Sequence, residues 1–544
     1  MTTVNSVPLP EGLSLSNIFV DNLPADPIQA TYPRQVQSAC YSAAEPKKTQ
    51  KPSLIAVSYD ALDDLGLSRE YGQDEGFLQV FSGNATYDGM TPYACCYGGH
   101  QFGNWAGQLG DGRAINLGEQ TSADGKRWAL QLKGAGPTPY SRSADGLAVL
   151  RSSVREFLCS EAMFYLGVPT TRALSLMLTG DLVERDMFYD GNREMEPGAV
   201  VCRTASNFIR FGSFELPASR GDLSTLKQLV DYTIVHEFPH LKAIWDTNPV
   251  DAYVAMFAEV ADATCDMIVH WMRVGFVHGV MNTDNMSIMG LTIDYGPYGW
   301  LDNFDPNWTP NTTDAQHQRY RYANQPAIAQ WNLLQLGNAL YPLVKDAEVL
   351  EKIIREFSSH YETRWQKMMA SKLGLSAAKG SADFYNRLEH LMFQSEVDMT
   401  LFYRQLADIK NRFDGLEGLN VEEEKASFAV WLQSVSYANE LTSDVKESFY
   451  TWCMDFKERS LHDTLSIEEQ IALMNTVNPV MVLRNYLAQE AIDLAGNGDY
   501  SKVHELLNAI KNPYTTENMP QDFMKKRPNW AMQKAGCSAL SCSS

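Results

Sequence analysis

The chain has 544 residues and a formal net charge of −21. This length exceeds what a single hydrophobic core supports, so we expect two or more domains. The acidity disfavours nucleic acid and anionic membranes as main partners, because both require a cationic protein face.

Hydropathy and cysteine usage point to a cytoplasmic protein. No run of about 18 apolar residues predicts a membrane span, and Met1–Pro8 has neither a hydrophobic signal core nor an Arg-rich transit pattern. The nine cysteines form no paired framework, which fits a reducing compartment. The sequence leaves the oligomeric state open, and a monomer is our default expectation.

Composition along the chain predicts four segments. Residues 1–75 are punctuated by Pro and Ser and are expected to wrap a core. Residues 76–215 mix strand-like and helical runs, and residues 216–370 become mainly helical, with a helix-like stretch over Lys227–Gly275. Residues 371–544 form a predicted helical extension, with helices expected over Val421–Leu441 and Ser501–Lys511.

A glycine-rich stretch opens the second segment. Tyr97–Gly103 and the following Gly107, Gly110 and Gly112 are residues that allow backbone N–H groups to approach a phosphate closely. The pattern is not a strict G-x-G-x-x-G motif. Taken alone, a glycine-rich loop is usually only a turn.

A predicted strand and helix follow. Trp128–Lys133 is a mostly apolar run bounded by glycines, and Lys133 at its end can point at a phosphate. A helix is predicted from Ser152 onward, with Ser152 or Ser153 as N-cap. Glu156 lies on this helix and can pair with Lys133. Individually such a Lys is usually solvated, and such a Glu usually only complements the helix dipole.

The most informative segment is His278–Asn285, followed by Asp294–Gly296. A protein kinase has H-x-D, an Asn five residues after that Asp, and then D-F-G. Here Asn285 is in register and Asp294 takes the metal-binding position, but Val280 replaces the catalytic base. Asp284 is an unused carboxylate beside Asn285. The pattern predicts retained phosphate and metal binding with altered phosphoryl chemistry.

Two arginines and a divalent metal fit the same chemistry. Arg203 and Arg210 can clamp phosphate oxygens, although a surface role is the default for any single arginine. Asn285 and Asp294 suit Mg²⁺, because hard oxygen ligands and substrate phosphates complete its octahedron; Mn²⁺ is an alternative.

Four runs resemble the selenoprotein O family, also called YdiU. They are Tyr97–Gly103, Gln108–Arg113, Leu150–Phe157 and His278–Ile288. The resemblance extends from Asn22–Asp26 and Pro33–Val36 to the terminal Ser541–Ser544, and so covers nearly the whole chain.

The resemblance implies an α+β, kinase-like bilobal fold with an N-terminal wrapping segment and a C-terminal helical extension. It implies transfer of AMP from ATP to Ser, Thr or Tyr hydroxyls of target proteins, with the nucleotide flipped relative to a kinase. Asp284 would be the proton acceptor, Asn285 and Asp294 the metal ligands, and Glu156 the partner of Lys133. The implied nucleotide contacts are Gly110, Gly112, Arg113, Lys133, Asp145, Gly146, Arg203, Arg210 and Asp294.

The chain departs from the family pattern at two places. Leu147 follows Asp145–Gly146 where the family has Arg, so we expect weaker nucleotide binding or substitution by Arg142 or Arg151. The tail has Ala539 and Cys542 where some members have a C-x-x-C or selenocysteine pair, and Pro310 replaces a loop cysteine. A tail-to-loop disulfide is therefore unsupported, and Cys537 and Cys542 carry no assigned redox role.

A zinc-protease reading competes with this interpretation, because His236–His240 matches H-E-x-x-H. Pro239 weighs against it, since proline inside a helix costs about 3 kcal/mol. A helix end leading into Leu241 explains the segment better.

Three further functions stay open: conventional protein phosphorylation with Asp284 as base, transfer of UMP, and a non-catalytic nucleotide-binding scaffold. The joint retention of Lys133, Glu156, Asn285 and Asp294 disfavours the scaffold, which would not need metal ligands.

Overall fold

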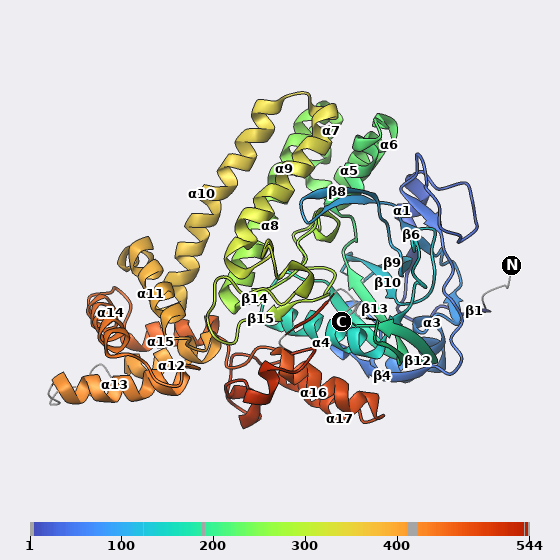
Figure 1. The fold of residues 1–544 in the computed structure, drawn as a ribbon. Coiled ribbons are helices and arrows are strands. Elements are labelled where there is room, and N and C mark those ends of the chain that lie inside the picture. Colours follow the sequence, from blue (N-terminus) through green and yellow to red (C-terminus); the bar gives the residue numbers. More distant parts are fainter. Residues whose placement is uncertain (1–4, 123, 188–190, 412–420, 538, 542–544) are drawn as a thin grey trace.

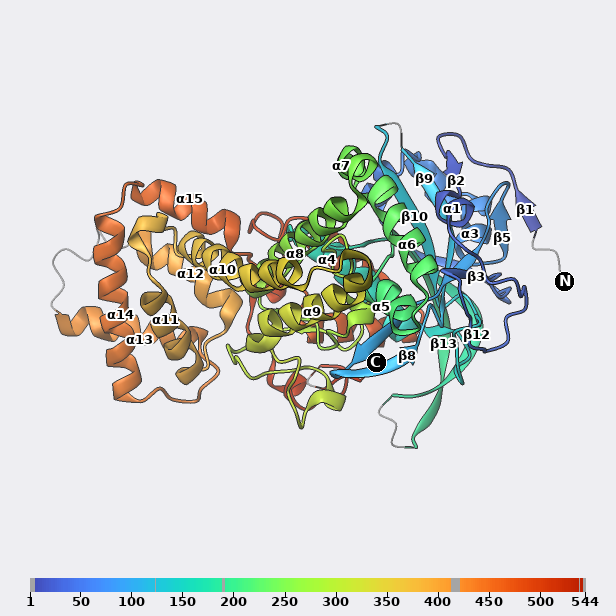
Figure 2. The same cartoon turned by 90° about the horizontal axis from the view of Figure 1, so that it is seen from above.

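The computed structural model describes residues 5–122, 124–187, 191–411, 421–537 and 539–541. It confirms the predicted mixture of helices and sheet. Figures 1 and 2 show a large twisted sheet at one end, a layer of long helices beside it, and a group of outer helices at the far end. Within the described ranges, none of the helices combines the length and apolar character needed to cross a bilayer.

The main sheet is antiparallel and has nine strands. Seven of them follow one another in the order β3 (Tyr41–Ala43), β6 (Tyr93–Cys95), β9 (Ala114–Thr121), β10 (Arg127–Lys133), β13 (Arg193–Ala205), β12 (Arg172–Asp186) and β4 (Ser53–Val57). Two short strands are added at the side: β2 (Leu15–Ser16) pairs with β9, and β11 (Ala148–Val149) pairs with β13.

Smaller strand pairs flank this sheet. The glycine-rich stretch forms an antiparallel hairpin of β7 (Gly98–Gln101) and β8 (Asn104–Gln108). The other pairs are β1 (Asn5–Val7) with β5 (Ala85–Tyr87), and β14 (Phe276–Val277) with β15 (Gly299–Trp300).

Strand β10 shows how the sequence positions the site. Leu130 and Leu132 point into the core on one face of the sheet, where α2 (Tyr59–Asp64) and α3 (Glu75–Phe81) cover it. Because side chains alternate along a strand, Gln131 and Lys133 point to the other face. Gln131 is paired in register with Arg203 of β13, so the three polar side chains share that face.

Helix α4 (Leu150–Tyr165) packs against β12 and β13 and carries the predicted Glu156. The predicted N-cap was wrong, because the helix starts directly after β11 at Leu150. The capping position is occupied by Val149, and Ser152 donates its hydroxyl to the Val149 carbonyl (3.1 Å) instead of capping an N–H group. The helix end just before Gly167–Pro169 agrees with the prediction.

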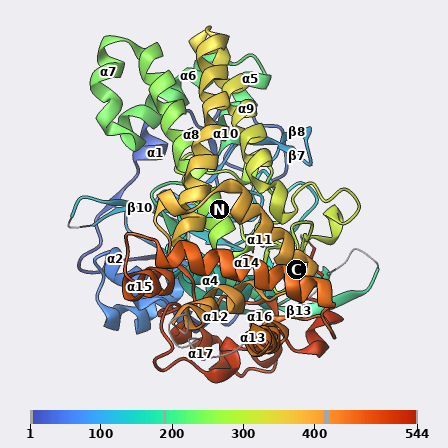
Figure 3. The same cartoon turned by 90° about the vertical axis from the view of Figure 1, so that its left-hand side faces the viewer.

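The helical layer and outer helices complete the chain. The layer contains α5 (Phe211–Ser219), α6 (Leu223–Tyr232), α7 (Lys242–Thr247), α8 (Pro249–Val274), α9 (Gln325–Val344) and α10 (Ala347–Lys372). The outer group contains α11 (Ala382–Gln394), α12 (Met399–Asn411), α13 (Val421–Val435), α14 (Ser443–Leu461) and α15 (Ile467–Val477). Figure 3 shows this group gathered around the lower end of α10.

The remaining elements lie at the two ends of the chain. Helices α16 (Asn485–Gly496) and α17 (Ser501–Ala509) pack back against α4, and α1 (Ile18–Asn22) lies near the N-terminus. The helix predicted over Val421–Leu441 ends earlier than expected, at Val435, and the one from Ser501 ends at Ala509.

Candidate functional site

A cavity of about 910 Å³ opens between the sheet and the helical layer. It is lined by eleven of the twelve side chains and glycines predicted from the sequence: Gly110, Gly112, Arg113, Lys133, Asp145, Gly146, Arg203, Arg210, Asp284, Asn285 and Asp294. The twelfth, Glu156, lies behind Lys133 and is buried. Residues far apart in the sequence therefore meet in one place.

Three cationic side chains converge on the Asp294 carboxylate. Lys133 Nζ lies 3.7 Å from Oδ1, and Arg203 Nη1 lies 2.7 Å from the same oxygen. Arg210 binds the other oxygen, Oδ2. Burial alone would raise the pKa of Asp294, but Arg210, Arg203 and Lys133 outweigh it and hold that pKa well below its usual range.

Glu156 anchors the same cluster from the side of α4. Its Oε2 lies 2.6 Å from Lys133 Nζ, and its Oε1 lies 3.0 Å from Arg203 Nη1. The predicted pairing of Glu156 with Lys133 is present, and the additional pairing with Arg203 follows from the register of β10 and β13. The two carboxylates and three cations thus form one buried network.

Asp284 lies at the edge of this network, in the short 3-10 helix Thr283–Asn285. Only 8% of the residue is exposed. Gln101 donates its amide N–H to Oδ2 (3.1 Å), and Arg210 donates to the Asp284 main-chain carbonyl (2.7 Å). Burial raises the pKa of Asp284 to about 7. A carboxylate with this pKa can take a proton near neutral pH.

Asn285 and His278 fix the loop around Asp284. Asn285 donates its amide nitrogen to the Val280 carbonyl (2.9 Å), which turns its oxygen the other way. His278 Nε2 bonds the carbonyl of Ile293 (2.9 Å), directly before Asp294. The ring therefore ties the two halves of the motif together.

Asn285 and Asp294 carry the kind of oxygen donor that a divalent ion such as Mg²⁺ prefers. Asn285 and Asp294 line the same cavity, and such an ion needs few protein ligands when substrate phosphates supply the others. Among the described residues, no group of three or more His, Cys, Asp or Glu could hold a metal ion by itself.

Two glycines allow the cavity wall to close tightly. Gly110 has φ +85°, and a Cβ there would come within 2.4 Å of the Tyr140 ring. Gly146 has φ +72°, and a Cβ there would lie 2.2 Å from the Gly136 carbonyl oxygen. Side chains other than hydrogen would push these turns apart.

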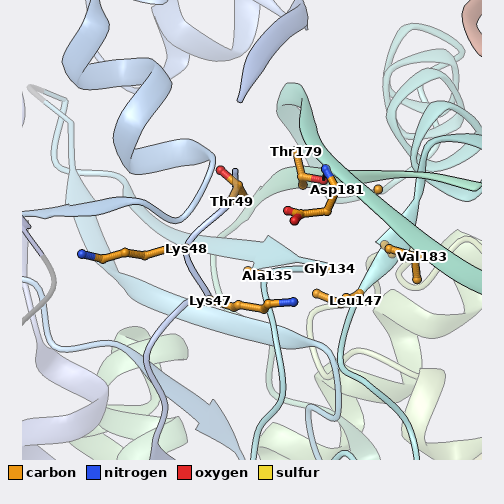
Figure 4. Close-up of a pocket in the computed structure, with 11 residues that line it drawn as sticks. Lys47, Lys48, Thr49, Gly134, Ala135, Leu147, Thr179, Asp181 and Val183 are labelled. Carbon is orange, nitrogen blue, oxygen red and sulfur yellow. Dashed lines mark hydrogen bonds between the residues drawn. The ribbon is translucent and has the colours of Figure 1, made fainter. Parts of the chain in front are cut away.

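The first departure from the family pattern has a structural counterpart. Leu147 lines the large cavity and also a small one of about 10 Å³ with Gly134 and Val183 (Figure 4). Arg185 of β12 binds Asp145 through both carboxylate oxygens (2.8 and 2.9 Å) and donates to the Leu147 carbonyl (2.9 Å). A guanidinium from another strand thus lies at the turn where Leu147 provides none.

The two arginines suggested as substitutes behave differently. Arg142 lines the cavity, whereas Arg151 binds Glu196 (2.8 Å) and lines a separate cavity of about 580 Å³. Arg151 therefore does not lie at the predicted site, because β11 and α4 carry it to the far side of the turn.

Sequence reasoning missed several residues around the cavity. Tyr97 stacks under Arg210, whose guanidinium carbon lies 4.7 Å from the ring centre, and Asp111 lies 3.7 Å from Arg210. Tyr97 and Asp111 both lie in glycine-rich runs that the sequence analysis had singled out. The polar residues of those runs could therefore have been predicted as site residues. Arg185 had no such signal, because only the pairing of β12 with β13 brings it there.

The expectation for Tyr97–Gly103 needs correction. The N–H of His100 donates to Thr283 Oγ1 (2.7 Å), and the N–H of Phe102 donates to Asn282 Oδ1 (3.2 Å). These donors are used within the protein and do not face a phosphate. The hairpin binds the loop that carries Asp284 instead.

The H-E-x-x-H segment is divided between two short helices. A π-helical turn ends at Glu237, and a 3-10 helix starts at Pro239 and ends at Leu241. This agrees with the helix end predicted for the segment. Glu237 binds Arg127 and Asn207, and His240 binds Glu259 (2.8 Å).

The tail approaches the loop that follows Asp294–Gly296. Leu540 donates to the Pro310 carbonyl (3.1 Å) and accepts from the Thr312 N–H (2.8 Å). Cys537 is buried, and Cys542 lies outside the described residues.

Comparison with known proteins supports the motif interpretation. The family described as "Protein adenylyltransferase SelO" matches residues 29–511. A "Protein nucleotidyltransferase YdiU" of Rhodopirellula baltica is 54% identical over 539 residues, covering 98% of this chain and 99% of that protein. Proteins with the same description from an Azoarcus species and from Flavobacterium johnsoniae are 52% and 50% identical, with 98% of this chain covered and 99% and 100% of theirs.

Proposed function

Because this chain belongs to the SelO family of protein adenylyltransferases, we propose that it transfers AMP from ATP to Ser, Thr or Tyr hydroxyls of other proteins. The observation that carries this proposal is the meeting of Asp284, Asp294 and three cationic side chains in one cavity. Val280 occupies the position of a kinase base and offers no group that takes a proton.

The proposed reaction is a displacement at the α-phosphorus. The acceptor oxygen forms a bond to that phosphorus, its proton passes to the Asp284 carboxylate, and pyrophosphate leaves with the electrons of the broken bond. Asp284 suits the role because its pKa of about 7 lies close to neutral pH.

Fixed positive charges serve the transition state. Lys133, Arg203 and Arg210 surround the place where phosphate oxygens gain negative charge, and a preformed arrangement of this kind needs little reorganisation. Glu156 keeps Lys133 and Arg203 oriented. Gly110, Gly112, Arg113, Asp145 and Gly146 are proposed to contact the nucleotide.

Asn285 and Asp294 are proposed to hold Mg²⁺ or Mn²⁺. When bound, such an ion neutralises phosphate charge and orients the leaving pyrophosphate. Asp294 would hold the ion through carboxylate oxygens that now bind Arg203 and Arg210.

The architecture is proposed to be two-lobed and kinase-like. The N-lobe would span residues 76–215 and the C-lobe residues 216–370, with residues 1–75 as the N-terminal segment and residues 371–544 as the helical extension. In favour of this division, β10 carries Lys133 on the sheet side of the cavity and the His278–Asn285 loop lies on the helical side.

Intact-mass measurement tests the proposed chemistry. The protein is incubated with ATP and Mg²⁺ together with a Ser- and Tyr-rich acceptor protein, and the mass of each protein is recorded. We expect an increase of one AMP per modified hydroxyl. An increase of one phosphate would instead establish conventional kinase activity, and incubation with UTP in place of ATP tests for UMP transfer.

A further inference from the structure

The β7–β8 hairpin holds the Asp284 loop one residue at a time. Phe102 donates its N–H to Asn282, His100 donates its N–H to Thr283, and Gln101 donates its side-chain amide to Asp284. Three consecutive residues of the loop are thus bound by three consecutive residues of the hairpin. These three hydrogen bonds together fix the conformation of the loop, which a single contact would not do.

The hairpin also covers the Asp284 carboxylate from its second side. Asp284 Oδ1 is buried, and none of the residues that the structure describes gives it a hydrogen bond. A Cβ built on Gly99 would come within 2.8 Å of this oxygen, so the glycine backbone lies directly against it. Buried carboxylate oxygens normally have a hydrogen-bond partner, so an oxygen left without one is unusual. Gln101 thus holds Oδ2 by a hydrogen bond, and Gly99 limits the space beside Oδ1.

We propose that Gln101 is a positioning residue for adenylyl transfer, which holds Asp284 Oδ2 so that the carboxylate faces the acceptor hydroxyl. The contact by Gln101 is the only side-chain hydrogen bond that the Asp284 carboxylate receives from the described part of the chain. An ionised carboxylate oxygen has two lone pairs, so Oδ2 keeps one for the acceptor proton. The inference rests on the proposed role of Asp284 as proton acceptor.

This assignment predicts that Gln101 affects the rate of transfer but not the affinity for ATP. Gln101 and Asp284 both line the cavity, but the cationic cluster around Asp294 involves neither side chain of this pair. Loss of the amide donor lets the carboxylate rotate out of line, and misplacement by about 1 Å can cost on the order of 100-fold in rate. ATP affinity depends on the cluster and is expected to change little.

Gln101→Glu is the sharpest test, because it keeps the shape and removes the donor. A carboxylate beside Asp284 also repels it. We expect kcat to fall on the order of 100-fold, with KM for ATP within about twofold of the parent value. A purely structural role would instead lower thermal stability and raise KM for ATP as kcat falls. Normal kcat, or a raised KM with unchanged kcat, would overturn the proposal.

Two further variants complete the design. Gly99→Ala adds a methyl group against Asp284 Oδ1 and leaves Gln101 in place, so it should lower kcat with little effect on KM even if Gln101→Glu folds poorly. Unchanged kcat in Gly99→Ala would likewise contradict the proposal that the hairpin positions the Asp284 carboxylate. Ala106→Ser, on the exposed part of the same hairpin, is the control and should behave like the parent.

Asp284→Asn distinguishes failure of this inference from failure of the proposed function. If Asp284→Asn loses transfer while Gln101→Glu stays fully active, the base assignment stands and the positioning role is wrong. Full activity in Asp284→Asn would overturn both, because Gln101 would then position a residue that transfer does not need. Thermal unfolding of each variant confirms that the fold is retained.

Discussion

At the scale of single residues, Asp294 has the most charged contacts in the site and an unusual backbone conformation. The backbone φ of Asp294 is +58°, in the left-handed region that few residues other than glycine adopt. Three cationic side chains bind its carboxylate and so hold the side chain in place. Strained backbone of this kind persists only when its surroundings fix it, and it is common at functional sites. Its neighbours therefore define both its charge and its direction.

Replacing Asp294 by Asn should remove transfer while leaving the protein folded. The amide keeps the size of the side chain but loses the negative charge that the proposed metal needs, and the loss of one preorganised charged group typically costs at least about 100-fold. Label transfer from ATP at saturating Mg²⁺ is the measurement. Asp251→Asn, on the exposed start of α8, is the control, and a parent-like rate in Asp294→Asn would remove the metal assignment.

At the scale of secondary-structure elements, buried ion pairs hold α4 in place. Arg172 of β12 binds Glu161 of α4 (2.8 Å), and both side chains are almost completely buried. Because α4 carries Glu156, this pair sets the distance from which Glu156 reaches Lys133. Arg155 holds the same helix through a hydrogen bond to the Tyr298 carbonyl (2.8 Å).

Glu161→Gln should destabilise the protein by about 3 kcal/mol, because buried Arg172 would then keep only the partly exposed Asp64 as a charged partner. The midpoint of urea unfolding reports the change. The exposed pair Lys242–Asp246 gives the comparison, since Asp246→Asn should cost at most about 1 kcal/mol. Equal effects of the two substitutions would contradict the role given to burial.

The C-terminal end of α8 should make stability depend on pH. His270 accepts a hydrogen bond from Arg273 Nε (3.2 Å), and burial together with the Arg273 charge lowers the His270 pKa from 6.5 to about 4. The folded state thus binds this proton less readily than the unfolded state. Its stability contribution is complete above about pH 6.5 and is lost as pH falls from 6.5 to 4.

We expect this loss to be about 1–2 kcal/mol, because the His270 side chain keeps partial contact with solvent. Urea unfolding at several pH values measures it in the parent and in His270→Gln, which can still accept from Arg273. The acid-side slope should be smaller in the variant. Identical slopes would show that another group is responsible.

At the scale of the whole molecule, a second buried cluster ties the helical extension to the body. Arg484, at the start of α16, lies 2.8 Å from Asp302 and 2.8 Å from Asp398, which precedes α12. Figure 1 shows α16 beside α4 and α12 among the outer helices. One guanidinium thus links three regions of the chain.

Arg484→Met should loosen this junction, because the fully buried Asp398 would lose its charged partner at a cost of about 3–5 kcal/mol. Hydrogen exchange should become faster in α12 and α16 and change little in β10 and β13. Arg387→Met removes an exposed pair with Asp455 and serves as control. Unchanged exchange in α12 would contradict the linking role.

The sequence predicted contiguous motifs better than it predicted their assembly. Lys133, Glu156, Asn285 and Asp294 were found because the kinase-like order assigns one residue type to each position. The N-cap of α4 was missed because β11 runs directly into the helix, and tertiary packing replaces a cap there. The contacts of Gln101 and Arg185 depend on strand register across long sequence separations, which local patterns do not specify.

The most direct test of the central claim uses ATP radiolabelled at the α-phosphate and, in a parallel reaction, at the γ-phosphate. Each is incubated with the protein, Mg²⁺ and a cell extract, with Asp294→Asn as the negative control. Adenylyl transfer through the described cavity predicts protein-bound label from the α-labelled nucleotide only, and none from the variant. Protein-bound label from the γ-labelled nucleotide, or equal labelling by Asp294→Asn, would contradict it.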